Sequence, residues 1–229
     1  MLKAIYTDID QFSNDEIKSL LPHISEERRL FALQIKNSKR FAECVVSEAL
    51  ARVALSLASG IPAGDFVIGR GEKGKPFQTT VPGLFFNISH SNGLCLCAVS
   101  DSDVGADIEK SGRIKLKRAK AFLSERELAE YEKAVCDGDR ALLATKFWCR
   151  KESYLKLLGT GFDRKPAEID TVSLDEAVFD EGVINSDFWY CICRKKLNLG
   201  LDKPDQIAQS RPTLNLIKTQ DIVVSLKKC

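Results

Sequence analysis

Two carboxylates lie two positions apart within an apolar stretch of the chain. Asp107 and Glu109 flank Ile108 in the segment VGADIEK. In an extended segment, residues at i and i+2 project from the same face, so two like charges would lie close together and would favour a bound cation. A hard ion such as Mg²⁺, which takes oxygen ligands from carboxylates and phosphates, would satisfy them. Taken alone, the pair is more typical of a solvated edge strand.

A third carboxylate belongs to a predicted helix in FWCRKESYLKLLG. At about 100° per residue, Glu152 and Lys156 share one side of this helix. The opposite, apolar face is predicted to consist of Leu143, Phe147, Tyr154 and Leu158. One interpretation is a surface ion pair four residues apart, worth about 0.2–0.5 kcal/mol. The functional alternative has Glu152 joining the metal and Lys156 facing a phosphate.

Further polar groups fall at predicted loops, where sites are commonly built on a rigid scaffold. They are Lys75 and Pro76 in GEKGKPF and His90 in ISHSNG. Each is ordinary by itself, since a lysine in a turn and a histidine with a polar partner are common. The basic run RIKLKRAK, which begins at Arg113, is more typical of a solvated face.

The elements that must position these groups follow from periodicity and capping signals. Strands are predicted for LKAIYTDI, DFVIGR, GLFFNISH and LCLCAVS, with SNG as a hairpin turn between the last two. Helical material is predicted from His23 to Gly60 with a break near Asn37, and again in the segments 122–135 and 139–159. Ser124 and Glu127 form a capping box. In the tail, IDTVSL, DFWYCICRKK and DIVVSL are predicted strands, and residues 201–213 a surface loop.

Composition excludes several classes of protein. The chain has 229 residues, of which 44% are hydrophobic, so it can bury a large core. A formal charge of +2 is far from the strongly basic balance of nucleic-acid binders. The N-terminus resembles no signal peptide, and no apolar run approaches the about 18 residues of a membrane span. We therefore expect a cytoplasmic protein without nucleic-acid or membrane partners, whose paired cysteines Cys95/Cys97 and Cys191/Cys193 are small buried residues rather than zinc ligands.

The order GKPF, FNISHS, VGADIE and FWCRKESYLKLLGTG, from Gly74 to Gly161, resembles a known family. It is similar to the pattern GKP, FNxSHS, GxDIE and WxxKEAxxKxxGxG of the 4′-phosphopantetheinyl transferases, specifically their longer single-chain, Sfp-type group. The resemblance implies a mixed α+β fold of two similar halves related by a pseudo-twofold, each a small antiparallel sheet with packed helices. We expect these halves at 1–103 and 104–229, with coenzyme A and the metal in the cleft between them. A faint repeat, ISEERR at Ile24 and LSEREL at Leu123, agrees with two halves.

The same resemblance implies roles for individual residues. Asp107, Glu109 and Glu152 would hold Mg²⁺ or Mn²⁺ against the pyrophosphate of coenzyme A, and Lys156, with Lys151, would neutralise its charge. The other residues implied in binding coenzyme A are Arg40, Lys75, Pro76, Ser89 and His90, with Arg40, Lys75 and His90 at the adenosine 3′-phosphate end. The reaction would transfer 4′-phosphopantetheine to a serine of an apo acyl or peptidyl carrier protein and release 3′,5′-ADP. Asp107, Glu152 and Lys156 are then the catalytic candidates, with Glu152 as the base that takes the serine proton directly or through water.

Some positions depart from the family pattern. Ser153 stands where alanine is usual, and Phe31 and Glu43 stand where several relatives have basic residues, which leaves Arg28, Lys39 and Arg40 as candidates in the early helices. An alternative is a noncatalytic module of the same fold that binds coenzyme A or a carrier protein. It predicts loss of a metal carboxylate or of Lys156, and all are present. By analogy the chain is expected to be a monomer.

Overall fold

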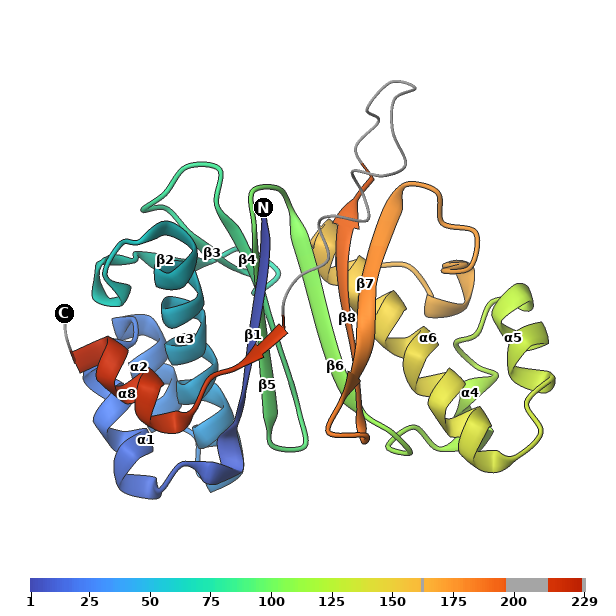
Figure 1. The fold of residues 1–229 in the computed structure, drawn as a ribbon, viewed down its shortest axis with the longest axis horizontal. Helices are drawn as coiled ribbons and strands as arrows, with labels where there is room; N and C mark the ends of the chain where they lie inside the picture. The colour runs from blue at the N-terminus through green and yellow to red at the C-terminus, as the bar shows by residue number, and fades with distance from the viewer. Residues whose placement is uncertain (162, 197–213, 228–229) are drawn as a thin grey trace. The chain divides into compact units, whose positions relative to one another are not determined.

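The chain forms two compact units in a computed structural model, which describes residues 1–161, 163–196 and 214–227. The first unit comprises residues 1–103 together with the segment from Lys203 to the C-terminus, and the second comprises residues 104–202 (Figure 1). None of the helices in the described ranges is both long and apolar enough to cross a membrane.

The first unit is built on a four-stranded sheet of order β4-β5-β1-β9. Its strands are β1 (Leu2–Asp8), β4 (Phe85–Ser91), β5 (Leu94–Ser100) and β9 (Leu214–Leu216), and a separate ribbon pairs β2 (Ile68–Arg70) with β3 (Pro76–Gln78). β4, β5 and β1 are antiparallel neighbours, whereas β9 runs parallel to β1. The hairpin predicted at SNG is confirmed, because Asn92 and Gly93 both have positive φ, 46° and 90°, as a tight turn between twisted strands requires.

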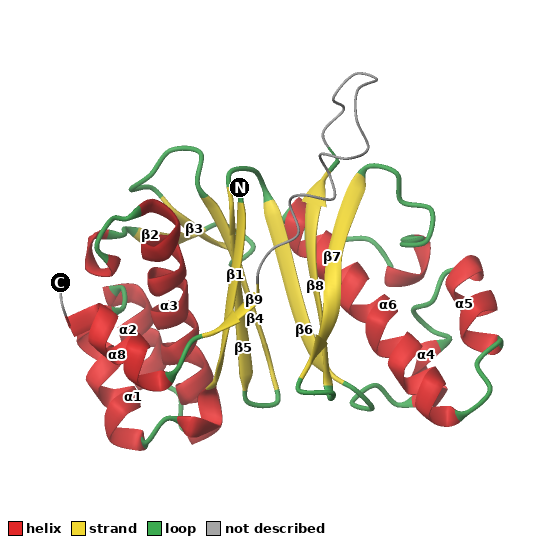
Figure 2. Cartoon of the chain, viewed as in Figure 1, coloured by secondary structure: helices red, strands yellow, loops and turns green. Residues whose placement is uncertain are grey.

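Helices cover one face of this sheet (Figure 2). They are α1 (Asn14–Leu20), α2 (Glu26–Leu33), α3 (Ser38–Ser59) and α8 (Thr219–Lys227), with 3₁₀ turns at Ile9–Gln11, Leu21–His23 and Ala63–Asp65. The predicted break before α3 is confirmed, since the Asn37 side chain accepts a hydrogen bond from Arg40 N at 2.9 Å. Central α3 is buried almost all round and packs on β1, β4 and β5. Cys95 and Cys97 are fully buried in this core, as predicted.

The second unit is a three-stranded antiparallel sheet of order β6-β8-β7 with helices on one face (Figure 2). Its elements are β6 (Val104–Lys110), β7 (Ala177–Ile184), β8 (Phe188–Lys195), α4 (Leu116–Ala119), α5 (Glu125–Glu132), α6 (Asp137–Leu158) and a 3₁₀ turn at Pro166–Glu168. The capping box of Ser124 and Glu127 is confirmed, and Gly159 ends α6 with a φ of 68°. Cys191 and Cys193 are buried here.

The two units have a common helical plan. In each, a serine caps an eight-residue helix, and a 22-residue helix that ends at a left-handed glycine follows it. Each plan is combined with a largely antiparallel sheet. The mixed α+β fold of small sheets and packed helices is therefore confirmed.

Two predicted strands are wrong. IDTVSL forms turns, because the Asp170 carboxylate accepts hydrogen bonds from Val172 N (3.2 Å) and Ser173 Oγ (2.7 Å), a local pattern that competes with strand pairing. DIVVSL lies in α8, where Ile222 and Leu226, four residues apart, are both fully buried. Strand β7 was not predicted, and the predicted loop 201–213 lies outside the described residues.

The end of the chain also differs from the expectation that residues 104–229 form one half. β9 pairs with β1 through Ala4 and Leu214, and Ile222 and Leu226 join the hydrophobic core of the first unit. The described C-terminal elements therefore belong to the first unit, because their apolar side chains complete its core.

A close approach between α6 and β6 organises the second unit. A Cβ atom on Gly105 would lie 1.9 Å from Ser153 O and 2.4 Å from Leu157 N, so only glycine allows the helix backbone to lie this close to the strand. Gly105, Asp107 and Glu109 alternate along β6 and therefore share the face that α6 covers. Residue 105 thus controls how near α6 lies to the carboxylates.

We predict that Gly105→Ala lowers the free energy of unfolding by about 3 kcal/mol or more, because the added methyl group meets backbone atoms that cannot turn away. Gly138→Ala is the matched control: its Cβ would meet only Cys136 Sγ at 3.6 Å, and alanine should stabilise this turn of α6 by up to about 1 kcal/mol. Urea denaturation of both variants tests the contrast. Equal stability of the two variants would contradict the close approach.

Candidate active site

The centre of the site is a buried carboxylate on β6. The Asp107 side chain is 4% exposed, and Lys156 Nζ on α6 lies 2.7 Å from Asp107 Oδ1. The same ammonium donates to Ala106 O at 3.1 Å. Burial opposes the charge on Lys156, but Asp107 outweighs it and raises the pKa of the lysine. Lys156 therefore pairs with the strand, and a simple surface pair with Glu152 is not what the structure contains.

Glu109 is the second carboxylate of β6. Its side chain is 12% exposed, and Arg113 Nη1 donates to both carboxylate oxygens, at 2.9 and 2.6 Å. The two carboxylates, two residues apart on one strand, therefore contact different cations: Asp107 contacts Lys156, and Glu109 contacts Arg113. The predicted strand geometry is thus found, but the solvated edge strand is not, because Asp107 is buried.

The negative charges of Asp107 and Glu109 both affect the pKa of Glu152 on α6. Burial and the negative charge of Asp107 raise its pKa to about 7, Lys156 acts in the opposite direction, and Glu109 raises it further. A carboxyl group with this pKa changes its protonation near neutral pH. The structure therefore brings Asp107, Glu109 and Glu152 into one electrostatic environment.

The donor chemistry of these residues fits a hard divalent cation. Three carboxylates supply the oxygen ligands that Mg²⁺ and Mn²⁺ prefer, and their mutual repulsion would be relieved by a cation. As the side chains stand, no three His, Cys, Asp or Glu residues in the described part of the chain are arranged to hold a metal ion. At this site, Lys156 contacts Asp107 and Arg113 contacts Glu109. A cation would have to loosen one or both of these contacts.

Lys151 does not belong to this group, contrary to the expectation that it helps to bind a phosphate. Its side chain is 1% exposed and lies 2.6 Å from a carboxylate oxygen of Glu127, itself fully buried. The ammonium also donates to Pro166 O at 2.8 Å and to Ile169 O. These three acceptors use all three N–H bonds, so in this structure Lys151 has a structural role.

The residues expected to contact coenzyme A from the first unit lie on three different elements. On β4, Ser89 is buried and His90 is exposed, since adjacent strand residues project to opposite faces. His90 Nδ1 lies 3.9 Å from a carboxylate oxygen of Glu43 on α3. Lys75 and Pro76 are half-buried at the start of β3, and Arg40 is exposed in the first turn of α3.

Two arginines lie together in the first unit, and only one of them was identified as a candidate from the sequence. Arg28, one of the candidates, and Arg70, which was not one, line a hollow of about 460 Å³. Burial and the charge of Arg28 lower the pKa of Arg70, as expected where two guanidinium groups lie close together. Arg28 also lies over the ring of Phe31, 5.7 Å from its centroid. The sequence carried no signal for Arg70, because β2 and α2 meet only through the fold.

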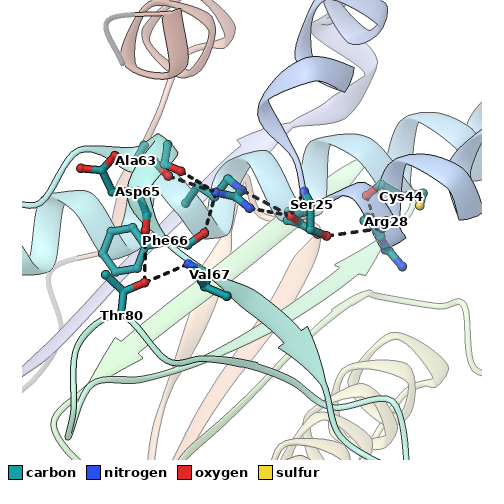
Figure 3. Close-up of polar contacts among 11 residues, drawn as sticks. Ser25, Arg28, Cys44, Ala63, Asp65, Phe66, Val67 and Thr80 are labelled. Carbon is teal, nitrogen blue, oxygen red and sulfur yellow. Dashed lines mark hydrogen bonds and ion pairs between the residues drawn. The ribbon is translucent and has the colours of Figure 1, made fainter.

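Partly buried polar contacts hold Arg28 in place (Figure 3). Its Nε donates to Cys44 O at 3.1 Å, and its backbone N–H donates to Ser25 Oγ at 3.3 Å. Ser25 in turn donates to the Glu48 carboxylate, which pairs with Arg52 at 3.2 Å, both side chains being at most 6% exposed. The start of α2 is therefore tied to the middle of α3.

Comparison with known proteins identifies the family. A family model described as the 4′-phosphopantetheinyl transferase superfamily matches residues 103–214. The chain is 31% identical over 162 residues to 4′-phosphopantetheinyl transferase gsp of Aneurinibacillus migulanus, covering 70% of this chain and 67% of that protein. It is 29% identical over 158 residues to 4′-phosphopantetheinyl transferase Sfp of Bacillus subtilis (strain 168), covering 69% and 70%. It is 30% identical over 175 residues to the L-aminoadipate-semialdehyde dehydrogenase-phosphopantetheinyl transferase of Saccharomyces cerevisiae, covering 70% and 61%.

These matches define a group-transfer enzyme. The chain belongs to the 4′-phosphopantetheinyl transferase family and is of the Sfp type, so the resemblance drawn from its motifs is confirmed.

The structural role of Lys151 gives a testable contrast. Lys151→Met should lower the free energy of unfolding by about 3–5 kcal/mol, because it leaves the Glu127 carboxylate buried without its cation. Lys133→Met, which removes an exposed lysine of the same unit, should change stability by less than about 0.5 kcal/mol. Urea denaturation measures both. A Lys151→Met protein of unchanged stability that no longer binds coenzyme A would restore the ligand role.

Proposed function

We propose that this chain transfers the 4′-phosphopantetheine group of coenzyme A to a serine hydroxyl of an apo carrier protein and releases 3′,5′-ADP. The observation that carries the proposal is the cluster on β6 and α6, where Asp107, Glu152 and Lys156 lie together on a chain of this family. Phosphoryl transfer needs positioning and charge neutralisation more than covalent chemistry from the protein. A buried cluster of carboxylates with a lysine is suited to both.

In the reaction, the serine oxygen forms a bond to the β-phosphorus of coenzyme A, and the bond from that phosphorus to the bridging oxygen breaks. Glu152 takes the serine proton directly or through a water molecule. Its pKa of about 7 supports this role, because a base works best when its pKa lies near the working pH. Lys156 neutralises negative charge on the pyrophosphate, and its raised pKa keeps it cationic at neutral pH.

Asp107, Glu109 and Glu152 would hold the divalent cation, Mg²⁺ or Mn²⁺, which supplies charge neutralisation of the pyrophosphate when bound. All three side chains supply the carboxylate oxygens that such a cation prefers. The ion pairs Asp107–Lys156 and Glu109–Arg113 would hold these two carboxylates in place before substrate arrives.

We place the adenosine 3′-phosphate end of coenzyme A on the first unit. Lys75, Pro76, Ser89, His90 and Arg40 remain proposed contacts there. Arg28 and Arg70 add support, since two guanidinium groups that line one hollow would be stabilised by an anion. The acceptor is an acyl or peptidyl carrier protein, the enzyme is monomeric, and its compartment is the cytoplasm.

A second candidate is a noncatalytic module that binds coenzyme A or a carrier protein. It is favoured by one observation: Asp107 and Glu109 are already neutralised by Lys156 and Arg113, as in a fold that needs no metal. The two candidates differ in whether a covalent product forms.

The first prediction is a phosphopantetheine adduct on an apo carrier protein. An apo acyl carrier protein and an apo peptidyl carrier protein would each be incubated with this chain, coenzyme A and Mg²⁺, with EDTA in a parallel sample. Intact-mass spectrometry should detect the adduct only without EDTA. Binding of coenzyme A with no adduct on either carrier would favour the noncatalytic module.

The second prediction concerns the carboxylates. Asp107→Asn and Glu152→Gln should each lower the rate of transfer by about 100-fold or more, because each removes a charge or a proton acceptor from the reacting centre. Glu168→Gln, an exposed carboxylate of the same unit, should transfer at the rate of the unchanged protein. Circular dichroism and thermal unfolding check that all three variants are folded. Full activity of either site variant would refute its assignment.

A further inference from the structure

Arg113 is a charged residue of the site region that the proposed function does not use. It follows β6 in a turn in which Gly112 has a φ of 76°, Arg113 N donates to Lys110 O at 3.2 Å, and Ser111 N donates to Asp187 O at 2.7 Å. This turn reverses the chain and returns the guanidinium to Glu109. The contact between residues four apart is thus made by a turn, outside any helix.

The two partners differ in how firmly they are held. The Glu109 side chain is 12% exposed and projects from a strand paired with β8 through Trp189. The Arg113 side chain is 54% exposed. Of the two groups, the arginine is already largely hydrated and can move further into solvent at little cost, whereas the carboxylate stays in place.

The contact occupies the atoms that a metal would need. One Arg113 nitrogen lies 2.9 Å from Glu109 Oε1 and 2.6 Å from Oε2, so both carboxylate oxygens face a positive charge. A divalent cation that binds Glu109 would meet electrostatic repulsion from this guanidinium unless the arginine moves away. Metal binding at Glu109 would therefore require the loss of this ion pair.

We propose that Arg113 is a built-in competitor of the divalent cation, a counter-ion whose release from Glu109 sets the metal affinity of this chain. This inference rests on the proposed metal site at Asp107, Glu109 and Glu152. Lys156 does not act in the same way, because its side chain is only 28% exposed, against 54% for Arg113. Arg113 is the cation that exchanges, and Lys156 is the one that stays.

The test is the affinity for Mn²⁺, followed by electron paramagnetic resonance of free Mn²⁺ with coenzyme A present and no carrier protein, so that no turnover occurs. Arg113→Gln should lower the Kd for Mn²⁺ by roughly three- to fivefold, the range expected for removing a partly exposed ion pair. Arg118→Gln is the matched control, since it removes an exposed cation from the same basic segment. Its Kd should match that of the unchanged protein. Asp107→Asn is measured in parallel.

The outcomes separate the inference from the metal site itself. If Asp107→Asn loses Mn²⁺ binding while Arg113→Gln binds no tighter than Arg118→Gln, the competitor role is wrong and the metal site stands. If Asp107→Asn binds Mn²⁺ as well as the unchanged protein, or if no protein binds Mn²⁺, the site assignment fails and the inference fails with it. Tighter binding by Arg113→Gln alone, abolished by adding Asp107→Asn, supports both.

Discussion

The contact between α6 and β6 at Gly105 is the constraint on which the site of the second unit depends. With a hydrogen atom in place of a side chain, the helix backbone lies against the strand at a distance that any Cβ would prevent. Asp107 follows two residues along the same face, and Lys156 adjoins Leu157, whose backbone faces Gly105. Because strand and helix are this close, a lysine and a carboxylate that are 49 residues apart in sequence form a 2.7 Å ion pair. Backbone packing brings the functional groups together, and their opposite charges then favour the ion pair between Lys156 and Asp107.

The ion pairs of the two units differ in how deeply they are buried, and this difference distinguishes structural pairs from the pairs of the site. Glu48 with Arg52 and Glu127 with Lys151 are almost fully enclosed, and each carboxylate has further backbone or hydroxyl donors. Such pairs are costly to desolvate and add little net stability, but losing one partner is severe, so they fix which segments meet. Glu127 shows this most clearly, since it caps α5, binds Thr171 and holds Lys151 at once. The pairs at Asp107 and Glu109 have more exposed cations, and Arg113, the more exposed of the two, is the one for which we propose exchange.

The sequence predicted most of what depends on neighbouring residues. The extended segment that carries Asp107 and Glu109, the helix break near Asn37, the cap at Ser124, and the helix ends at Gly60 and Gly159 all follow from period, capping and glycine conformation. The predictions failed where the structure of a segment depends on a residue that is distant in sequence. The family resemblance implied that Lys151 helps to neutralise the pyrophosphate, and nothing in its segment shows that Glu127, 24 residues earlier, pairs with it in the core. DIVVSL has the composition of a strand, but it packs as a helix because Ile222 and Leu226 fill the core of the first unit.

The charges of the site explain why its carboxyl groups are not equivalent. Asp107 and Glu109 each accept hydrogen bonds from a cation, so three carboxylates meet two positive groups, Lys156 and Arg113. The excess negative charge acts on Glu152, whose pKa rises to about 7 because of burial and repulsion by the other two carboxylates. Glu152 lies on a helix near these two carboxylates of β6, so its pKa depends on the charges around it. In the proposed reaction, a divalent cation would lower the pKa of Glu152 and the negative pyrophosphate would raise it, because each changes the charge around the carboxyl group.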